Sequence, residues 1–265
     1  MRELHRLELD GFNITVPYKE AVLPYLDGIH PVARAIGAVN TVVRKGRRWV
    51  GFNTDQVGFI TSLQKEGRFN PRGKKVLILG AGGSARAVAY GLAQRGPRAI
   101  TIANRTVNRA QKMVSDYRRL FPRVEWKAIP SFQSSQDLSP GYSSVGEGGK
   151  KRTSSLSLSP FRGRGKGEGV QIDLVVNATS VGLRPTDQPL VRPQDFPRRT
   201  LFCDLIYNPA QTRLLRLAQR SGHRTLNGMG MLVYQGAEAF RLWTGRKAPI
   251  GVMRRVMAGK RTGRE

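Results

Sequence analysis

The sequence has a single cysteine, Cys203, and three scattered histidines, His5, His30 and His223, in 265 residues. One cysteine excludes an internal disulfide and is typical of a protein in a reducing compartment, so we expect a cytoplasmic location. The few cysteine and histidine residues are too widely spaced to form a cluster of metal ligands. The sequence therefore predicts no metal site.

Long hydrophobic runs are also lacking. No stretch approaches the roughly 18 apolar residues that a membrane-spanning helix needs. The N-terminal segment MRELHRLELDGFN is charged and lacks the apolar centre of a signal peptide. Hydrophobic residues make up 39% and charged residues 24% of the chain, which is close to the globular average and argues against wholesale disorder. We therefore expect a globular protein with no membrane partner.

Acidic residues are scarce, since 18 Asp and Glu face 45 Lys and Arg, for a net charge of +27. Such a charge is found in nucleic-acid-binding proteins. It also concentrates anionic small molecules, such as a dinucleotide or a carboxylate substrate. The basic residues are spread through the chain, without an aromatic-interleaved stripe or helix-turn-helix spacing. We therefore expect a small anionic substrate and no specific nucleic-acid partner.

The middle of the chain alternates strand-like and helix-like runs. The predicted strands are 74–79, 98–104, 124–130, 172–179 and 200–207, and the predicted helices are 84–96, 107–120 and 212–222. Glycines at 96 and 222 are the last residues of two of these predicted helices and are typical C-terminal stops. This alternation predicts an α/β protein with a Rossmann-type, doubly wound parallel sheet.

Both chain ends differ from this middle part. The first fifty residues have short strand-like runs, and two more helices are predicted before Gly245 and over 249–259. We expect residues 1–56 and 227–265 to form a smaller α/β substrate domain and residues 57–226 to form the dinucleotide-binding domain. Residues 133–169 are rich in Ser, Gly, Lys and Arg, which predicts a disordered insertion, with a basic interaction loop as the alternative.

A glycine-rich loop, GAGGSA at residues 80–85, lies between a predicted strand and a predicted helix. Gly80 permits a tight turn, Gly82 lets the backbone approach a pyrophosphate, and Ala85 lets the helix pack closely on the strand. The helix N-terminus offers free N–H groups and a partial positive charge to phosphates. The loop therefore predicts dinucleotide binding.

The end of the second strand of this unit predicts which dinucleotide binds. An NAD site places an Asp or Glu there to bind the ribose 2′-hydroxyl. This chain instead has Asn104, Arg105 and Thr106, followed by Arg109, with no carboxylate in the run. Arginine would pair with a 2′-phosphate, which an acid would repel. We therefore expect NADP rather than NAD.

Lys19 and Asp55 are candidates for acid–base chemistry. Reduction of a ketone needs a proton donor at the developing alkoxide, and a lysine held by a carboxylate can supply it. From their spacing in the chain, however, both residues would ordinarily lie on the surface. Neutral polar residues that suit a polyhydroxy ligand accompany them, namely Asn13, Thr15, Asn40 and Thr54.

Taken in order, several motifs closely resemble the shikimate dehydrogenase family from about residue 7 to 260. These motifs are GFNITVPYK, GAVNTVV, GFNTD, GAGGSA, NRTVNR, NATSVGL, DLIYNP and NGMGMLVYQGAEAF. The resemblance implies NADPH-dependent reduction of 3-dehydroshikimate to shikimate, on the route to chorismate and aromatic amino acids. A quinate/shikimate dehydrogenase with relaxed cofactor use and a truncated, non-catalytic NADP-binding protein are the alternatives. A homodimer remains open as the assembly.

The resemblance also implies roles for individual residues. Lys19 matches the acid–base lysine, and Asp55 matches its partner, which also contacts substrate. The other positions that match the substrate pocket are Thr15, Asn40, Tyr207 and Gln235. The positions that match the cofactor site are Gly80, Ala81, Gly82, Gly83, Ser84, Asn104, Arg105, Thr106 and Arg109, together with Leu205 and Gly228 near the nicotinamide.

The chain departs from the family pattern at two places. Family members carry a further N-terminal segment of roughly fifty residues, with a first strand whose loss would expose the edge of a sheet. That segment includes a Ser-x-Ser loop for the substrate carboxylate, and we expect that the true start of the protein lies upstream. The second departure is the insertion at 133–169, where the family has a short connection.

Overall fold

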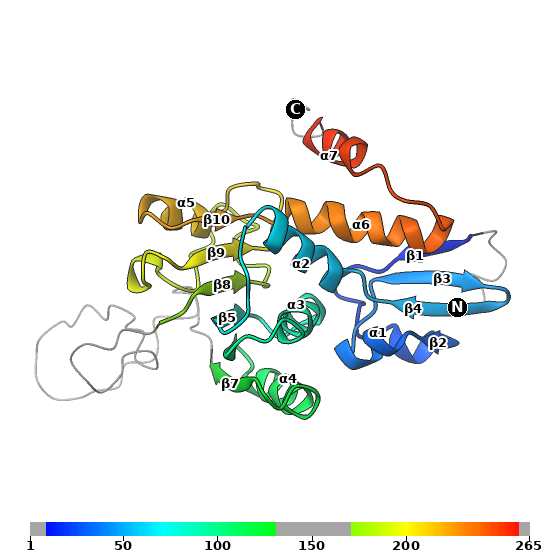
Figure 1. Cartoon of the computed structure of the whole chain (residues 1–265), viewed down its shortest axis with the longest axis horizontal. Coiled ribbons are helices and arrows are strands. Elements are labelled where there is room, and N and C mark those ends of the chain that lie inside the picture. Colours follow the sequence, from blue (N-terminus) through cyan, green and yellow to red (C-terminus); the bar gives the residue numbers. More distant parts are fainter. Residues whose placement is uncertain (1–8, 131–170, 260–265) are drawn as a thin grey trace, which may run out of the picture.

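The computed structural model describes residues 9–130 and 171–259. It contains two β-sheets with helices around and between them (Figure 1). The strands are β1 (Gly11–Asn13), β2 (Gly28–Ile29), β3 (Thr41–Lys45), β4 (Arg48–Phe52), β5 (Lys75–Leu79), β6 (Ala99–Asn104), β7 (Glu125–Pro130), β8 (Leu174–Asn177), β9 (Leu201–Asp204) and β10 (Thr225–Leu226). The helices are α1 (Pro31–Ile36), α2 (Asp55–Lys65), α3 (Gly83–Ala93), α4 (Val107–Leu120), α5 (Arg213–Arg220), α6 (Met229–Thr244) and α7 (Ile250–Gly259), with 3-10 turns at Leu23–Tyr25 and Pro193–Asp195.

The larger sheet has six parallel strands in the order β10-β9-β8-β5-β6-β7. In its central strand β5, Val76 and Ile78 join the core beneath α3 and α4, whereas Leu77 and Leu79 join the core beneath α5. A strand covered on both faces is apolar throughout, which explains the uninterrupted KVLIL run. The order of strands reverses at β5, so the predicted Rossmann-type doubly wound fold is confirmed. We call this sheet with α3, α4 and α5 the large lobe.

The predicted elements of the large lobe agree with the structure to within a few residues. Helix α4 spans the predicted 107–120, and β5 to β9 fall on the predicted strands. Helix α3 ends at Ala93, earlier than predicted, and Gly96 lies in the following turn with φ of 68°. The structure also has helix α2, for which the sequence gives no prediction; Gly58 in its first turns has low intrinsic helix propensity.

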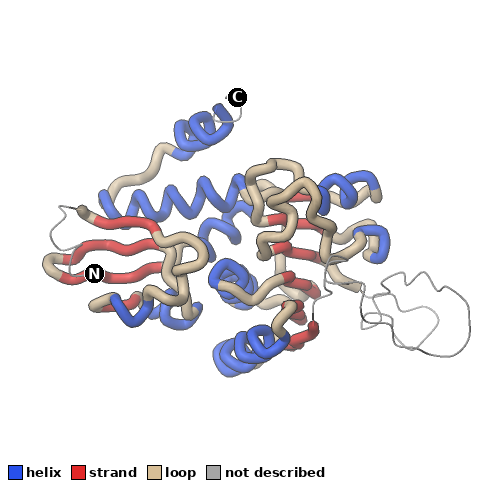
Figure 2. Tube along the Cα trace, turned by 180° about the vertical axis from the view of Figure 1, so that it is seen from behind, coloured by secondary structure: helices blue, strands red, loops and turns tan. Residues whose placement is uncertain are grey.

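The smaller sheet has the order β1-β3-β4-β2, with β2 parallel to β4 and the other pairs antiparallel. Ala33 of α1 packs with Val39, Val42 and Trp49 to form its fully buried cluster. Side chains such as Phe12 and Ile29 are only partly covered around that cluster. We call this sheet with α1 and residues 14–27, which pack against the same cluster, the small lobe. Figure 2 shows its strands as a group separate from those of the large lobe.

Helices α2 and α6 pack against each other between the lobes (Figure 1). A Cβ at Gly58 would lie 2.7 Å from the backbone nitrogen of Gln235, so the two helices can approach this closely only at glycine. Near the C-terminal end of α6, Trp243 Nε1 donates to the Val42 carbonyl at 2.9 Å. Helix α6 therefore begins beside the large lobe and ends on the small lobe.

The predicted domain boundaries stay predictions. The boundary after residue 56 falls inside α2, whose first residue is Asp55 and whose last is Lys65. The strands of the small sheet all lie before this helix, and those of the large sheet all lie between α2 and α6. The predicted insertion at 133–169 lies outside the described residues.

Candidate active site

Lys19 and Asp55 lie in direct contact. Lys19 Nζ is 2.6 Å from Asp55 Oδ2 and donates a second hydrogen bond to Ser84 Oγ at 3.3 Å. Only 12% of the Lys19 side chain and 5% of the Asp55 side chain are exposed. An ammonium has three hydrogens, so one remains for a third acceptor. The pair can therefore hold and donate a proton next to the glycine loop.

Local structure brings these two residues together. The Lys19 carbonyl accepts a hydrogen bond from Val39 N at 2.8 Å, which joins its segment to the residues before β3. Asp55 is the first residue of α2, where the helix dipole stabilises a carboxylate. The expectation from spacing, that both residues would lie on the surface, is wrong because β3 and β4 fold the two segments side by side.

Asn40 links the pair to the end of the small sheet. Its Nδ2 lies 2.9 Å from Asp55 Oδ1, 3.0 Å from Thr54 Oγ1 and 3.2 Å from Gln235 Oε1. An amide nitrogen has two hydrogens, so these acceptors compete for them. Asn40 Oδ1 accepts from Thr54 N at 2.8 Å, which fixes the amide in place. Asn40 and Gln235, predicted separately, therefore belong to one polar cluster with the lysine–aspartate pair.

The glycine loop adopts the turn that its sequence predicts. Gly80 has φ of +108°, and a Cβ there would lie 3.0 Å from the Ala178 carbonyl oxygen. A Cβ at Gly82 would meet nothing within 4 Å, so the backbone at this position is open to a ligand. A Cβ at Gly83 would lie 3.0 Å from Lys19 Cβ. The loop is thus both a turn that requires glycine at residue 80 and the surface against which the lysine segment packs.

The run after β6 lies at the start of α4. Asn104 Nδ2 donates to the Thr106 carbonyl at 2.8 Å, which closes the turn before the helix. Arg105 and Thr106 are exposed. Arg109 Nη2 lies 3.3 Å from Glu20 Oε1, a residue of the small lobe next to Lys19 in the chain. No motif in the sequence indicates this contact between the lobes.

Leu205 and Gly228, which the resemblance assigns to the same side of the cofactor site, are in contact although they are separated in the sequence. A Cβ at Gly228 would overlap the Leu205 carbonyl oxygen, so the backbones approach this closely only because residue 228 is glycine. Gly228 N also donates to the Ile206 carbonyl at 3.1 Å. The described structure gives Thr15 and Tyr207 no side-chain hydrogen bond, and Tyr207 is 42% exposed.

The turn before Tyr207 is held by a buried carboxylate that sequence reasoning did not single out. Asp204 accepts hydrogen bonds from Asn177 Nδ2 at 3.0 Å, Ile206 N at 3.1 Å and Thr212 Oγ1 at 2.7 Å. Burial raises the pKa of the Asp204 carboxyl, and the three donors oppose that rise. The DLIYNP motif contained Asp204, but a strand-end aspartate has no sequence signal that distinguishes this role.

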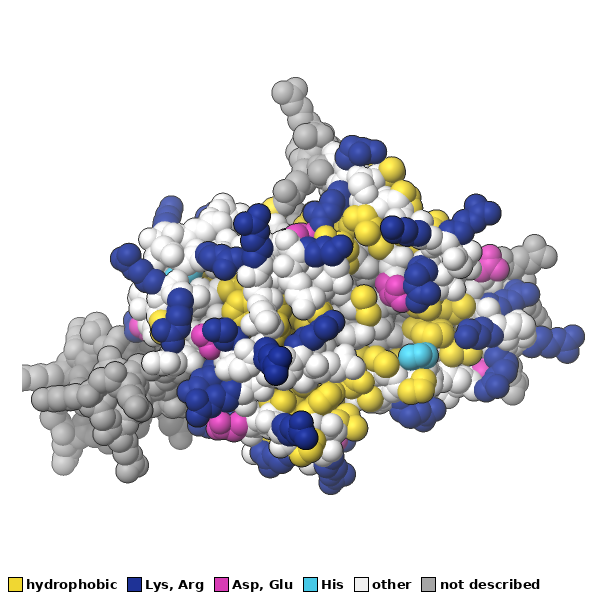
Figure 3. Space-filling model, viewed as in Figure 1, with side chains coloured by type: hydrophobic (Ala, Val, Ile, Leu, Met, Phe, Trp, Pro, Cys, Tyr) yellow, Lys and Arg dark blue, Asp and Glu magenta, His cyan; other side chains and the backbone are white. Residues whose placement is uncertain are grey.

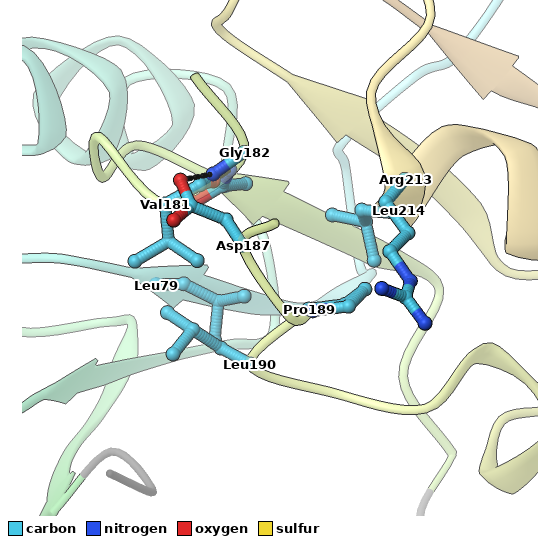
Figure 4. Close-up of a pocket in the computed structure, with 9 residues that line it drawn as sticks. Leu79, Val181, Gly182, Asp187, Pro189, Leu190, Arg213 and Leu214 are labelled. Carbon is cyan, nitrogen blue, oxygen red and sulfur yellow. Dashed lines mark hydrogen bonds between the residues drawn. The ribbon is translucent and has the colours of Figure 1, made fainter. Parts of the chain in front are cut away.

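A small pocket lies beside these strand ends, next to the loop that follows β8. Leu79, Val181 and Leu190 form part of its wall, and Figure 4 shows Asp187 bonded to Gly182 there. Asp187 Oδ2 accepts from Gly182 N at 2.8 Å and Arg184 N at 3.1 Å. These backbone donors lower the pKa of the Asp187 carboxyl.

Helix α1 is anchored to the large lobe at its C-terminus. The Ile36 carbonyl accepts from Arg86 Nε at 2.5 Å, and the Tyr117 hydroxyl lies 3.1 Å from the same oxygen. Asp116 holds the Arg86 guanidinium from the other side at 3.1 Å. Burial raises the pKa of Tyr117 well above its ordinary value. Because Gly37 and Ala38 follow at once, this anchor also positions the segment that leads to Asn40.

Basic side chains are spread over both lobes on the face shown in Figure 3, not gathered in one stripe. Within residues 9–130 and 171–259, no group of three or more His, Cys, Asp or Glu side chains could hold a metal ion. No helix in the described part of the chain is long and apolar enough to cross a membrane.

The class of protein that fits this arrangement is a two-lobed α/β oxidoreductase, in which a lysine of the small lobe, paired with an aspartate at the start of α2, faces the glycine loop of the large lobe. The chain belongs to the shikimate dehydrogenase family. Residues 1–42 match the shikimate dehydrogenase substrate binding domain, 63–131 match shikimate / quinate 5-dehydrogenase, and 228–258 match the shikimate 5′-dehydrogenase C-terminal domain.

Similar proteins cover most of the chain. A shikimate dehydrogenase (NADP(+)) of Desulforamulus reducens is 43% identical over 95% of this chain and 77% of its own length. A crystal structure of a shikimate dehydrogenase in complex with NADP+ has a TM-score of 0.77 and 32% identity, over 98% of this chain and 79% of that one. Quinate dehydrogenase from Corynebacterium glutamicum in complex with NAD has a TM-score of 0.75 and 30% identity, over 97% and 80% of the two chains.

Proposed function

We propose that this protein reduces 3-dehydroshikimate to shikimate with NADPH. The observation that carries the proposal is the contact of Lys19 Nζ with both Asp55 and Ser84. It brings a proton donor of the small lobe to the first turn of the helix that follows the glycine loop. Family membership and the NADP-dependent relatives support the same reaction.

The residues of the large lobe fit NADP. The open backbone at Gly82 and the free N–H groups at the start of α3 suit a pyrophosphate. Arg105 and Arg109 supply positive charge after β6, where the 2′-phosphate of a bound dinucleotide is expected. When bound, the reduced nicotinamide supplies the hydride for the ketone carbon.

The small lobe supplies the proton and the orientation of the substrate. Lys19 Nζ donates a proton to the oxygen that gains negative charge, so ketone, hydride and proton together give the alcohol. Asp55 holds the ammonium at 2.6 Å and keeps it pointed at the site. Asn40 and Gln235 offer amide groups to substrate hydroxyls, and we assign Thr15 and Tyr207 to the same pocket. Leu205 and Gly228 are assigned to the nicotinamide side.

The experiment that tests this proposal mixes the purified protein with NADPH and 3-dehydroshikimate. We expect the absorbance band of the reduced nicotinamide to fall, and to rise again with NADP and shikimate. A folded protein that binds NADPH, shows no affinity for shikimate and gives no turnover would instead be the non-catalytic NADP-binding protein.

Quinate oxidation with NAD is a second candidate, favoured by the likeness to the quinate dehydrogenase and by the family model that covers both substrates. Comparing shikimate with quinate, and NADP with NAD, as ratios of kcat/KM separates the two. Preference for shikimate and NADP supports the first proposal. Comparable values with quinate and NAD would replace it with the second.

Three remaining expectations concern the setting of the enzyme. A cytoplasmic location is predicted from the single cysteine. A homodimer is a prediction that sedimentation would test. Absence of a specific nucleic-acid partner is predicted from the dispersed charge, and retention on nucleic acid that persists at high salt would contradict it.

A further inference from the structure

The ion pair between Glu20 and Arg109 joins the two lobes across the site. Glu20 Oε1 lies 3.3 Å from Arg109 Nη2, with 41% of the Glu20 side chain and 57% of the Arg109 side chain exposed. Glu20 directly follows Lys19 in the chain, and Arg109 lies in the first turn of α4. The pair therefore connects the proton-donating segment to the part of the large lobe that follows β6.

The two arginines after β6 differ in their surroundings. Arg105 is exposed, and among the described residues its side chain has no ion pair or hydrogen bond. Arg109 already has an anionic partner. A 2′-phosphate arriving at this helix start would meet one available guanidinium and one that is engaged by a carboxylate. A carboxylate and a phosphate on the same guanidinium repel each other.

The basic residue next to Glu20 in the chain is paired with a different carboxylate. The Lys19 ammonium is engaged by Asp55 at 2.6 Å on the buried side. Among the described residues, Arg109 is therefore the cation that pairs with Glu20, at the place where a second anion is expected.

We propose that Glu20 competes with the cofactor's 2′-phosphate for Arg109, and so limits how strongly the protein prefers NADP over NAD. This rests on the proposed function, because it takes Arg109 as a ligand of the 2′-phosphate. Glu20 lowers the affinity for NADPH. It does not affect NADH, which lacks the 2′-phosphate and leaves the ion pair in place. Glu20 is thus a specificity-determining residue that the motif search did not include.

The test measures dissociation constants of NADPH and NADH by nicotinamide fluorescence, in the full-length chain at low ionic strength. For Glu20→Gln we expect NADPH to bind about two- to fivefold more tightly, the size of a half-exposed ion pair, with NADH unchanged. The gain should shrink at high salt, where exposed charges are screened. In the Arg109→Gln background, adding Glu20→Gln should no longer tighten NADPH binding. In the Arg105→Gln background, adding Glu20→Gln should still tighten it.

The matched control is Asp195→Asn, which makes the same change in net charge at an exposed ion pair with Arg192 inside the large lobe. It should leave both affinities unchanged. Unchanged or weaker NADPH binding by Glu20→Gln overturns the proposal, as does an equal gain for NADH. If neither Arg105→Gln nor Arg109→Gln weakens NADPH relative to NADH, the cofactor assignment itself fails, and the role of Glu20 fails with it.

Discussion

The large lobe buries its sheet on both faces, with α3 and α4 on one side and α5 on the other, whereas the small lobe has only a compact cluster around Trp49. The two proposed sites also differ in how their residues are distributed along the chain. The large lobe presents its loop and its arginines in short contiguous runs, 80–85 and 104–109. The other proposed site is assembled from Lys19 and Asn40 of the small lobe, Asp55 at the start of α2 and Gln235 of α6. The proposed dinucleotide site is thus built from short local stretches of this chain, whereas the proposed proton-transfer site depends on its tertiary fold.

The largest expected effect comes from removing the proton donor of the small lobe. Lys19→Ala should lower kcat by about 10²- to 10⁴-fold, because the alkoxide loses its positioned acid. NADPH affinity should stay nearly unchanged, since the glycine loop and the arginines remain. Steady-state kinetics and fluorescence titration measure the two quantities. Lys45→Ala, an exposed lysine in β3, is the control, and less than a tenfold loss in Lys19→Ala would remove the residue from the proton-transfer step.

Two glycines with positive φ allow the lobes to be compared directly. Gly80→Ala places a Cβ 3.0 Å from the Ala178 carbonyl at φ of +108°, whereas Gly46→Ala, at φ of +60°, meets nothing within 4 Å. Gly46→Ala should lower the free energy of unfolding by about 1–2 kcal/mol from backbone strain alone. Gly80→Ala should cost more and also weaken NADPH binding. Denaturant unfolding and cofactor titration of both variants test this, and equal losses would contradict it.

The anchor of α1 on the large lobe should have a smaller effect. Tyr117→Phe removes the hydroxyl near the Ile36 carbonyl and should lower the free energy of unfolding by about 1 kcal/mol. Arg86→Lys removes the fixed guanidinium geometry at the same oxygen. Because both side chains share one acceptor, the double variant should lose less than the sum of the single losses. Denaturant unfolding of the four proteins measures the coupling, and strictly additive losses would show that the two contacts act independently.

The smallest expected effect depends on pH. Two backbone N–H groups lower the pKa of Asp187 in the folded protein, so its contribution to stability is present above the unfolded pKa and is lost as pH falls through the folded pKa. Asp187→Asn should therefore unfold at a lower temperature than the original chain at neutral pH. The difference should shrink below about pH 4, where an ordinary aspartate begins to be protonated. Thermal unfolding across this range tests the sign, and a constant difference would refute it.

Much of the large lobe could be predicted because its signals are local. An apolar strand, a glycine turn and a helix of regular spacing follow one another within residues 74–96, and the structure has them there. The start of α4 was likewise placed correctly after Thr106. Helix α2 has no such local signal. Its Gly58 is explained by close packing against the backbone of Gln235, a residue far away in the sequence.

The contacts between the lobes could not be predicted in the same way. Glu20 meets Arg109, and Arg86 meets the Ile36 carbonyl, across long stretches of chain. No periodicity or motif marks such pairs, because each residue alone is an ordinary charged side chain. The resemblance to a family pointed to Lys19 and Asp55, and spacing alone pointed away from them.

The sequence by itself determined the parallel sheet, the glycine loop at residues 80–85 and the basic run that ends at Arg109, because each depends on neighbours in the chain. Only the tertiary structure decided that Lys19 lies 2.6 Å from Asp55 and 3.3 Å from Ser84. The physical reason is that the proposed proton donor must be held against both a carboxylate and the glycine loop. Those groups come from different lobes, which meet only when the whole chain has folded.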